Sequence, residues 1–518
     1  MIKMKLCTPI YKNNLLLYTV LNPFVRRGMK IVGMEKADVI VIGAGAAGIA
    51  ASCRLLQNNI QNILILEARN RIGGRIHSIQ VDGSSIDLGA QWCHGEENNV
   101  VYTLAKDLDV LSPSINDYTS FNLYSPTLFL DKDVVEQILA ISMMIADDME
   151  ALENSEENFG EYFKKRFLAE IGKQLQQEFT PQFTNALMDW IHKLEMCLNA
   201  CPTWYDLSAK GLIHFKSCDG NYYLHWRDRG YKTILDILMG EFSDPERKLP
   251  IREKIVFNKT VTRILTDKQI GVTILCSDGS RYNAKQVLVT LPLGVLKKTR
   301  NSLFEPQLPL YKVDAINGLG FGTVNKIFLK FPLQWWQRDC QGISTVWSEK
   351  DIEYVSKEFP HGPVQGGKSW LESIFGFYPI DSHSNILLVW VVGSLVEEIE
   401  KLTNDVIISG LMFVLKYFVG SRYPDIPNPD AVICSKWNSD PYTCGSYSYR
   451  SILSNKMNVF ASDLAKPISL NDKPVLMFAG EATSSHQYST VHGAISSGFR
   501  EADRIISTYK KAEPKSKL

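Results

Sequence analysis

The pattern of apolar and polar positions predicts a strand, a helix and a second strand near the start of the chain. Residues 37–42 (ADVIVI) form an apolar run typical of a buried strand, interrupted only by Asp38. A run of glycine and alanine follows, and residues 49–57 then form a helical stretch. A second strand is expected at 62–66, directly before Glu67. The segment therefore predicts a βαβ unit.

The turn inside this unit reads Gly43-Ala44-Gly45-Ala46-Ala47-Gly48, a GxGxxG pattern. The first glycine allows a tight turn, the second lets the backbone approach a pyrophosphate, and Gly48 lets the helix pack close to the strand. The helix N-terminus supplies amide donors for phosphate. Glu67, about 20 residues further on, would bind ribose hydroxyls. Strand, turn, helix and acid together predict a dinucleotide-binding site.

The rest of the chain alternates between helical and strand-forming stretches. Residues 101–235 are mostly helical by their apolar periodicity. Later strands are expected at 254–264, 272–276, 286–290 and 475–479, with an Asp278-Gly279 hairpin signal and a final helix at 491–509. Strands of the cofactor-binding type thus come from both ends and the middle of the chain. We therefore expect an α/β fold with mixed α+β character, built as two interleaved domains.

Composition and charge exclude several classes of protein. The 518 residues contain 56 basic and 56 acidic side chains, which argues against nucleic acid as a bulk electrostatic partner. No apolar run reaches the roughly 18 residues that a membrane span needs. The ten cysteines form no CxxC and no His-Cys cluster at zinc-ligand spacing, so no metal site is expected. The oligomeric state stays open.

The two ends of the chain carry an excess of positive charge. Residues 1–34 hold six basic side chains and no acid. They are either a weak targeting peptide or, as we favour, part of a disordered extension over residues 1–36, with a working start at Met29 or Met34. The ending Ser516-Lys517-Leu518 matches the tripeptide that the peroxisomal import receptor reads, so we expect a peroxisomal protein, or a cytoplasmic one if the signal is unused. The body between the ends is acidic, which suits a polycationic substrate.

A second glycine loop, Gly73-Gly74-Arg75, follows Glu67 and has no purpose in a nicotinamide enzyme. Arg75 is available there to a phosphate. Further strings follow in order: 89–95 (GAQWCHG), 290–296 (TLPLGVL), 322–327 (GTVNKI), Trp437 with 445–449 (GSYSY), 480–483 (GEAT) and 490–494 (TVHGA). With these motifs the chain resembles the flavin amine oxidases over residues 37–509. The polyamine oxidase branch is the most similar.

The resemblance implies a Rossmann-type FAD-binding domain interleaved with a substrate domain of mixed sheet and helices. The first would hold residues 37–95, 225–322 and 432–509, the second 96–224 and 323–431, and 510–518 would be a tail. FAD is expected to be non-covalent, because Ser446 stands where monoamine oxidases have a flavin-linked cysteine and Cys444 is two residues away. The residues implied for cofactor binding are Gly43, Gly45, Gly48, Glu67, Arg75, Gln91, Trp92, Val261, Trp437, Glu481, Thr490 and Val491.

The resemblance also implies a chemistry: hydride transfer from the carbon beside a neutral amine to flavin, hydrolysis of the imine to an aldehyde and a shorter amine, and reduction of oxygen to hydrogen peroxide. Lys326 would reach the flavin N5 through a water and assist reoxidation. His94 would lie near the substrate amines, and Tyr447 would form one wall of the amine slot. Glu195 would meet a distal polyamine nitrogen, or it is simply a solvated helix glutamate.

Several alternatives stay open from the sequence. The acids between residues 147 and 161 form a run of seven with no base, which is either a solvated helix face or a patch that steers a cation. The expected substrates are spermine, spermidine or their N-acetyl derivatives, and a spermine-preferring oxidase is equally compatible. A lysine demethylase-like enzyme or an inactive FAD-binding protein is less favoured. Val324 departs from the asparagine of some acetylpolyamine oxidases, which leaves the preferred amine undecided.

Overall fold

The computed structural model describes residues 35–116, 121–174, 179–242, 245–269 and 271–512. The basic segment 1–34 and the Ser516-Lys517-Leu518 ending lie outside these residues. Glu35 and Lys36, which we assign to the extension from the sequence, already belong to strand β1 (Glu35–Ile42). In the described part of the chain, no helix is long and apolar enough to cross a membrane.

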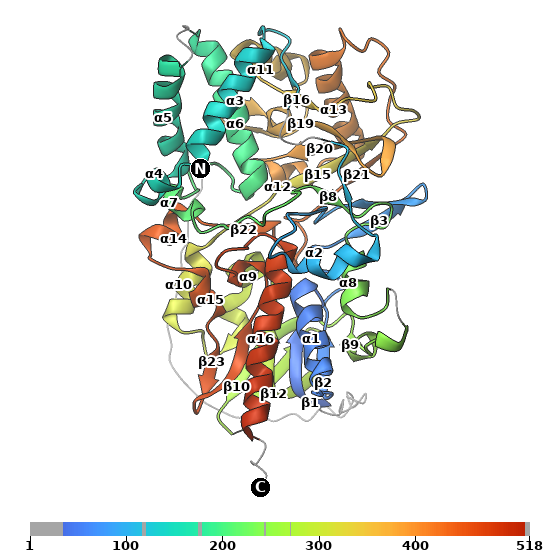
Figure 1. Cartoon of the computed structure of the whole chain (residues 1–518), viewed down its shortest axis with the longest axis vertical. Helices are drawn as coiled ribbons and strands as arrows, with labels where there is room; N and C mark the ends of the chain where they lie inside the picture. The colour runs from blue at the N-terminus through green and yellow to red at the C-terminus, as the bar shows by residue number, and fades with distance from the viewer. Residues whose placement is uncertain (1–34, 117–120, 175–178, 243–244, 270, 513–518) are drawn as a thin grey trace, which may run out of the picture. The chain divides into compact units, whose positions relative to one another are not determined.

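A nine-stranded sheet contains the βαβ unit that the N-terminal pattern predicts (Figure 1). Its centre is parallel, because β1 pairs in parallel with β2 and β12, and β12 pairs in parallel with β24. The predicted Asp278-Gly279 turn joins two antiparallel strands, β11 and β12. The strands are β1, β2 (Ile63–Leu66), β9 (Ile255–Val256), β10 (Val261–Asp267), β11 (Gly271–Cys276), β12 (Arg281–Val289), β13 (Phe304–Glu305), β23 (Ile468–Leu470) and β24 (Lys473–Phe478).

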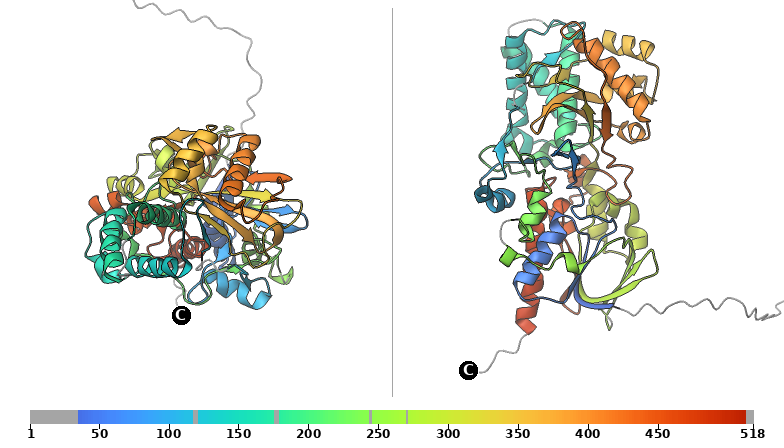
Figure 2. Two further views of the ribbon diagram at one scale, coloured as in Figure 1. Left: turned by 90° about the horizontal axis from the view of Figure 1, so that it is seen from above. Right: turned by 90° about the vertical axis from the view of Figure 1, so that its right-hand side faces the viewer.

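Helices cover both faces of this sheet (Figure 2, right). Val39 and Val41 of β1 pack with α1 and α16, while Ile40 and Ile42 pack with α9 and α10 on the opposite face. The helices here are α1 (Ala46–Gln57), α2 (Val100–Ala105), α8 (Thr233–Leu238), α9 (Leu293–Leu303), α10 (Leu310–Gly318), α14 (Ile452–Lys456), α15 (Ala461–Ala465) and α16 (Val491–Ala512). The alternation of β1 side chains confirms a strand buried on both faces, as its continuous apolar run indicates.

A second sheet of six strands, antiparallel except for one pair, has α6 and α13 on its two faces (Figure 1). Its strands are β7 (Leu123–Tyr124), β15 (Asn325–Lys330), β16 (Ile343–Thr345), β19 (Ile374–Ile380), β20 (His383–Val391) and β21 (Ala431–Cys434). The helices here are α3 (Lys132–Ala146), α4 (Met149–Glu153), α5 (Phe159–Gln174), α6 (Pro181–Asn199), α7 (Ala209–Leu212), α11 (Glu349–Glu358), α12 (Val396–Ile399) and α13 (Asn404–Val419). The strands of the two sheets interleave along the chain, and the expected domain boundaries stay a prediction.

Short strands in the described residues form four smaller sheets. They are β3 (Ser78–Val81) with β4 (Ser84–Asp87), β5 (Trp92–Cys93) with β6 (Ser112–Pro113) and β8 (Leu224–His225), β14 (Gly320–Gly322) with β22 (Tyr447–Tyr449), and β17 (Val364–Gln365) with β18 (Lys368–Ser369). β6 and β8 interrupt the stretch 101–235 that the periodicity predicts as mostly helical. Several strands in this group span only two residues, too few for a period of two to stand out.

Element boundaries differ from the predicted ones where turns intervene. Helix α1 begins at Ala46, three residues early, because the glycine turn itself ends at Gly45. The predicted strand 254–264 is two strands, since Asn258 has a φ of +58° and the Lys259 N–H donates to the Glu67 carbonyl oxygen. The strand predicted at 286–290 is the second half of β12. α16 extends to Ala512, so the predicted tail begins inside a helix.

Candidate active site

A cavity of about 950 Å³ is lined by residues from both sheets. All the residues predicted for the site line it, except Gly48. We call the part that is lined by residues from the segments 42–47, 66–76 and 488–494 the glycine half. We call the part that Met143, Ala146, Asp147, Met149 and the residues Leu194, Glu195, Cys197, Leu198 and Asn199 line the acidic half. The tertiary structure therefore brings together residues whose positions span most of the described chain.

The glycine half is shaped for close approach by another molecule. Gly43 has a φ of +105°, and a Cβ at Gly48 would lie 2.0 Å from the Gly43 carbonyl oxygen, so both positions require glycine. The two glycine loops touch, because the Gly73 N–H donates to the Ala44 carbonyl oxygen at 2.8 Å. The buried Glu67 carboxylate accepts from the backbone N–H of Ala44 at 2.7 Å. This cradle fits a dinucleotide, as the GxGxxG pattern predicts.

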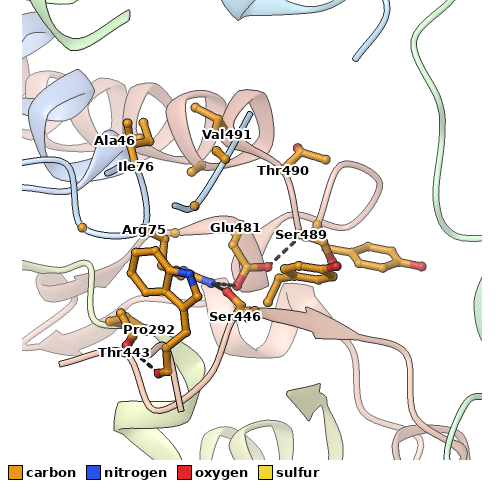
Figure 3. Close-up of a pocket in the computed structure, with 18 of the residues that line it drawn as sticks. Ala46, Arg75, Ile76, Pro292, Thr443, Ser446, Glu481, Ser489, Thr490 and Val491 are labelled. Carbon is orange, nitrogen blue, oxygen red and sulfur yellow. Dashed lines mark hydrogen bonds and ion pairs between the residues drawn. The ribbon is translucent and has the colours of Figure 1, made fainter. Parts of the chain in front are cut away.

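Arg75 and Glu481 both line the cavity and form an ion pair (Figure 3). Arg75 Nη1 donates to Glu481 Oε1 at 2.8 Å and to the Ser446 carbonyl oxygen at 2.8 Å. Glu481 Oε2 accepts from Ser448 Oγ at 2.6 Å and from the Ser489 N–H at 2.8 Å. Protein donors therefore occupy both oxygens of the Glu481 carboxylate. Through these contacts, the Glu481 carboxylate holds the segments that contain Arg75, Ser448 and Ser489 against one another.

Helix α16 begins at the edge of the cavity (Figure 3). Thr490, Val491 and His492 line the cavity, and Thr490 Oγ1 accepts from the Gly493 N–H at 3.0 Å. The first amides of a helix have no acceptor within the helix, and its N-terminus carries partial positive charge. This end of α16 can therefore stabilise negative charge on a group bound in the cavity.

Lys326 is buried on β15 with its amine among three acceptors. Nζ lies 3.1 Å from the Asp87 carbonyl oxygen, 2.8 Å from the Gly89 carbonyl oxygen and 2.7 Å from Gln91 Oε1. Burial lowers the pKa of Lys326, and the charge of the Asp87 carboxylate opposes that shift. An ammonium group can serve all three acceptors at once, and a water-mediated contact with a flavin would replace one of them. Lys326 is therefore not an ordinary surface lysine.

His94 follows β5 and packs on the Tyr222 ring at 4.5 Å between centroids. Its Nδ1 lies 2.8 Å from the Tyr222 carbonyl oxygen, which makes Nδ1–H the donor and leaves Nε2 as an acceptor. Burial lowers the pKa of His94 to about 4. The imidazole is therefore neutral near pH 7 and can accept a hydrogen bond from an amine N–H.

Tyr447 lines the cavity, with its hydroxyl donating to the Cys197 carbonyl oxygen at 2.5 Å. This bond connects β22 to the end of α6. The neighbouring Ser446 hydroxyl donates to the Val324 carbonyl oxygen at 3.0 Å and accepts from the Val324 N–H at 3.1 Å. Cys444 is not among the residues that line the cavity.

The remaining predicted cofactor residues also face the cavity. Trp437 donates from Nε1 to the Leu88 carbonyl oxygen at 2.9 Å, which fixes its indole against the strand that leads to Gln91. Trp92 stacks on Trp390 with ring centroids 6.2 Å apart. Val261 is the first residue of β10 and lines the cavity. Aromatic and apolar side chains thus form most of the wall, as ligand cavities usually require.

The acidic half contains Glu195 of α6, only 8% exposed. Glu195 Oε2 accepts from Asn199 Nδ2 at 3.1 Å. Burial raises the pKa of Glu195 to about 7, and the negative charge of Asp147 adds to the rise. The alternative of a solvated helix glutamate is therefore wrong. Asp147 is the single member of the acidic run 147–161 among the residues that line the cavity.

Sequence reasoning missed three contributors to the site. Trp390 lies beside Lys326, with Nζ 5.0 Å from its ring centroid. Tyr222 lines the cavity and orients His94. Asp87 supplies both a carbonyl acceptor and a carboxylate charge near Lys326. The β15–β20 register that pairs Lys326 with Trp390 joins positions far apart in sequence, so no local signal could reveal it. Asp87 could have been found from the sequence, because it lies two residues before the recognised motif Gly89-Ala90-Gln91-Trp92.

The fold and this site define a flavin-dependent amine oxidoreductase. The chain belongs to the family described as "Flavin containing amine oxidoreductase", whose model matches residues 46–506. The match confirms the family resemblance that the ordered motifs indicate.

Individual relatives are similar over most of the chain. The chain is 31% identical over 513 residues to a Bos taurus protein named "Peroxisomal N(1)-acetyl-spermine/spermidine oxidase", covering 91% of this chain and 95% of that protein. It is 28% identical over 554 residues to "Probable polyamine oxidase 5" of Arabidopsis thaliana, covering 92% and 99%. A solved structure of wild-type putrescine oxidase bound to putrescine shares the fold with a TM-score of 0.64 at 16% identity, covering 92% and 100%.

Proposed function

We propose that this chain oxidises polyamines, namely spermine, spermidine or their N-acetyl derivatives, with non-covalent FAD and molecular oxygen. One observation carries the proposal: in a single cavity, the glycine half fits a dinucleotide and the acidic half contains the buried Glu195 carboxylate. The relatives whose names mention polyamine or acetyl-spermine oxidation support the same substrate class.

The chain's own residues bind and orient the reactants. When bound, the flavin would supply the acceptor for a hydride from the carbon beside an amine and would then reduce oxygen to hydrogen peroxide. Loss of the hydride turns the amine into an imine, which water hydrolyses to an aldehyde and a shorter amine. Neutral His94 would accept a hydrogen bond from the substrate amine through Nε2. Tyr447 and Trp390 would form apolar walls that exclude water. Lys326 would exchange one of its three acceptors for a water that it donates to.

The cysteines near the cavity support non-covalent cofactor binding. Ser446 replaces a linking cysteine, and Cys444 does not line the cavity. Cys197 does line it, but burial raises the pKa of its thiol well above the usual range, which keeps it protonated and unreactive. Acid precipitation should therefore release the flavin into the supernatant. Flavin that stays in the pellet would contradict this.

Peroxisomal location is part of the proposal, supported by the Ser516-Lys517-Leu518 ending and by the printed name of the bovine relative. Removing these three residues should leave kcat unchanged and make the protein diffuse in cells. Unchanged peroxisomal puncta would point to another signal.

The direct test mixes the flavin-loaded protein with spermine, spermidine and their acetyl derivatives without oxygen. The yellow absorbance should bleach with at least one of them, and admitting oxygen should restore it with release of hydrogen peroxide, aldehyde and a shorter amine. A protein that binds flavin yet never bleaches with any amine would instead be a flavoprotein without this activity.

A further inference from the structure

Lys326 and Trp390 occupy directly opposite positions of the antiparallel pair β15 and β20. Side chains at such positions project from the same face of a sheet and contact each other. Lys326 Nζ lies 5.0 Å from the centroid of the Trp390 ring. The Lys326 backbone is also fixed, because its N–H donates to Ser435 Oγ at 2.8 Å and its carbonyl oxygen accepts from the Ser435 N–H at 2.9 Å. The strand pairing therefore brings the amine to this ring.

Trp92 adds a second ring near the same amine. Its centroid is 5.8 Å from Lys326 Nζ, and the Trp92 and Trp390 rings stack with centroids 6.2 Å apart and 23° between their planes. Both distances to the amine fall within the roughly 6 Å over which an indole face attracts a cation. All three residues line the cavity. We call Trp92 and Trp390 the indole pair.

The indole pair attracts the charge of Lys326 without taking any of its hydrogen bonds. The ammonium has three N–H donors, and the Asp87 and Gly89 carbonyl oxygens and Gln91 Oε1 accept from it. An aromatic face acts on a cation through its quadrupole, so all three donors stay available to these acceptors or to a water. A carboxylate in the same place would instead occupy one donor.

The charge state of Lys326 is a balance between burial and its neighbours. Burial favours the neutral amine and lowers the pKa of Lys326, and the charge of the Asp87 carboxylate on β4 opposes that shift. His94 also faces Lys326, but burial lowers the pKa of His94 to about 4, so its imidazole is neutral near pH 7. Asp87 and the indole pair are therefore the neighbours that favour the ammonium.

We propose that Trp390 is a positioning residue for the oxygen step: together with Trp92, it keeps Lys326 charged at the cavity wall and leaves the N–H donors of Lys326 available to a water. This rests on the polyamine oxidation proposed above and on the role of Lys326 in it. Reduction of O2 to hydrogen peroxide takes two electrons from the reduced flavin and two protons, and negative charge develops on the oxygen before it is protonated. A fixed ammonium stabilises that charge, whereas a neutral amine does not.

The test first measures the pKa of Lys326. Because Lys326 lines the cavity, competitive acetylation of the flavin-loaded protein with acetic anhydride over a pH series, followed by mass spectrometry of the Lys326 peptide, reports this pKa. Trp390→Leu should lower it by about one unit, and Trp390→Phe, which keeps a ring face, should lower it less. The matched control is Trp335→Leu, because Trp335 is half-buried like Trp390 and is not among the residues that line the cavity. The control should leave the pKa of Lys326 unchanged.

Stopped-flow mixing of oxygen with the dithionite-reduced protein gives the second measurement. Above the measured wild-type pKa of Lys326, Trp390→Leu should reoxidise about 10-fold more slowly than wild type at the same pH, because a tenfold smaller fraction carries the ammonium. Well below both pKa values, the two proteins should reoxidise at equal rates. Chemical reduction keeps this step measurable even if no polyamine bleaches the flavin, so failure of the proposed function is a separate result.

An unchanged pKa of Lys326 in Trp390→Leu would overturn the inference. A slower oxygen step that is the same at every pH would also overturn it, because lost packing would then be responsible. If Trp390→Leu does not fold, Trp390→Phe is compared with a protein that has 4-cyanophenylalanine in place of Trp390. The cyano group withdraws electrons from the ring, so this protein should have the lower Lys326 pKa of the two. Equal pKa values for these two proteins would contradict the role.

Discussion

The two halves of the cavity are built in opposite ways. The glycine half consists mainly of backbone: two loops in contact, glycines that no other residue can replace, and the start of α16. The acidic half consists of side chains on helices, and its carboxylates come from α6 and from the junction of α3 and α4. A backbone cradle tolerates few sequences and serves one cofactor. In the acidic half, a single substitution can change which substrate the enzyme binds.

The largest expected effect is loss of flavin binding, from a substitution that disrupts only the glycine half. Gly48→Ala would place a methyl group 2.0 Å from the Gly43 carbonyl oxygen, so the turn and α1 must move apart. We expect a purified protein without flavin absorbance and without amine oxidation. Gly172→Ala, in α5, is the control, because a Cβ there meets nothing within 4 Å. Full flavin content in Gly48→Ala would show that the cradle does not depend on this contact.

The next effect concerns Lys326, which belongs to neither half. Lys326→Met should slow reoxidation by oxygen by roughly 100-fold, the scale of a lost proton-handling group, while flavin remains bound. Stopped-flow measurement of the reduced enzyme mixed with oxygen gives this rate. The matched control is Lys330→Met on the same strand, where the ammonium pairs with Asp82 at 2.6 Å near the surface. Equal oxygen rates in wild type and Lys326→Met would refute the role.

The smallest effect is on stability and concerns the acidic half. The pKa of Glu195 is raised to about 7 from an ordinary 4.5, so the unfolded chain loses this proton at a lower pH than the folded protein does. Stability therefore falls as pH rises from 4.5 to 7, and the loss is complete above pH 7. Glu195→Gln lacks this penalty. Without amine, it should be more stable than wild type at pH 8 by up to about 3 kcal/mol and indistinguishable at pH 4.

Thermal unfolding of the two proteins across this pH range measures the difference, with Glu153→Gln as the exposed control. A variant that gains stability but loses affinity for spermine would show that Glu195 is kept for binding rather than for folding. A difference that is the same at pH 4 and pH 8 would show that packing, not ionisation, is responsible.

The nine-stranded sheet shows which elements of the fold can be predicted from the sequence. The continuous apolar run of β1, the glycine turn and Glu67 are local signals, and the structure confirms the strand, turn, helix and strand they predict. The short strands β5, β6 and β8 have no such signal, because two residues carry no periodicity. Lys326 was assigned from its motif, yet its three acceptors come from residues 87–91, which lie on another strand and its loop.

The sequence by itself determined the family and the glycine half, since these depend on backbone conformations that specific local motifs require. Only the tertiary structure decided the acidic half. Seven acids in the run 147–161 look alike in sequence, and for Glu195 the sequence leaves open whether it meets a distal polyamine nitrogen or is a solvated helix glutamate. The packing of α3, α5 and α6 into one apolar core places Asp147 on the cavity and buries Glu195, while Asp148 pairs with Arg166 and Glu156 with Lys210. Burial and charge pairing depend on neighbours distant in sequence, which is why no local pattern reveals them.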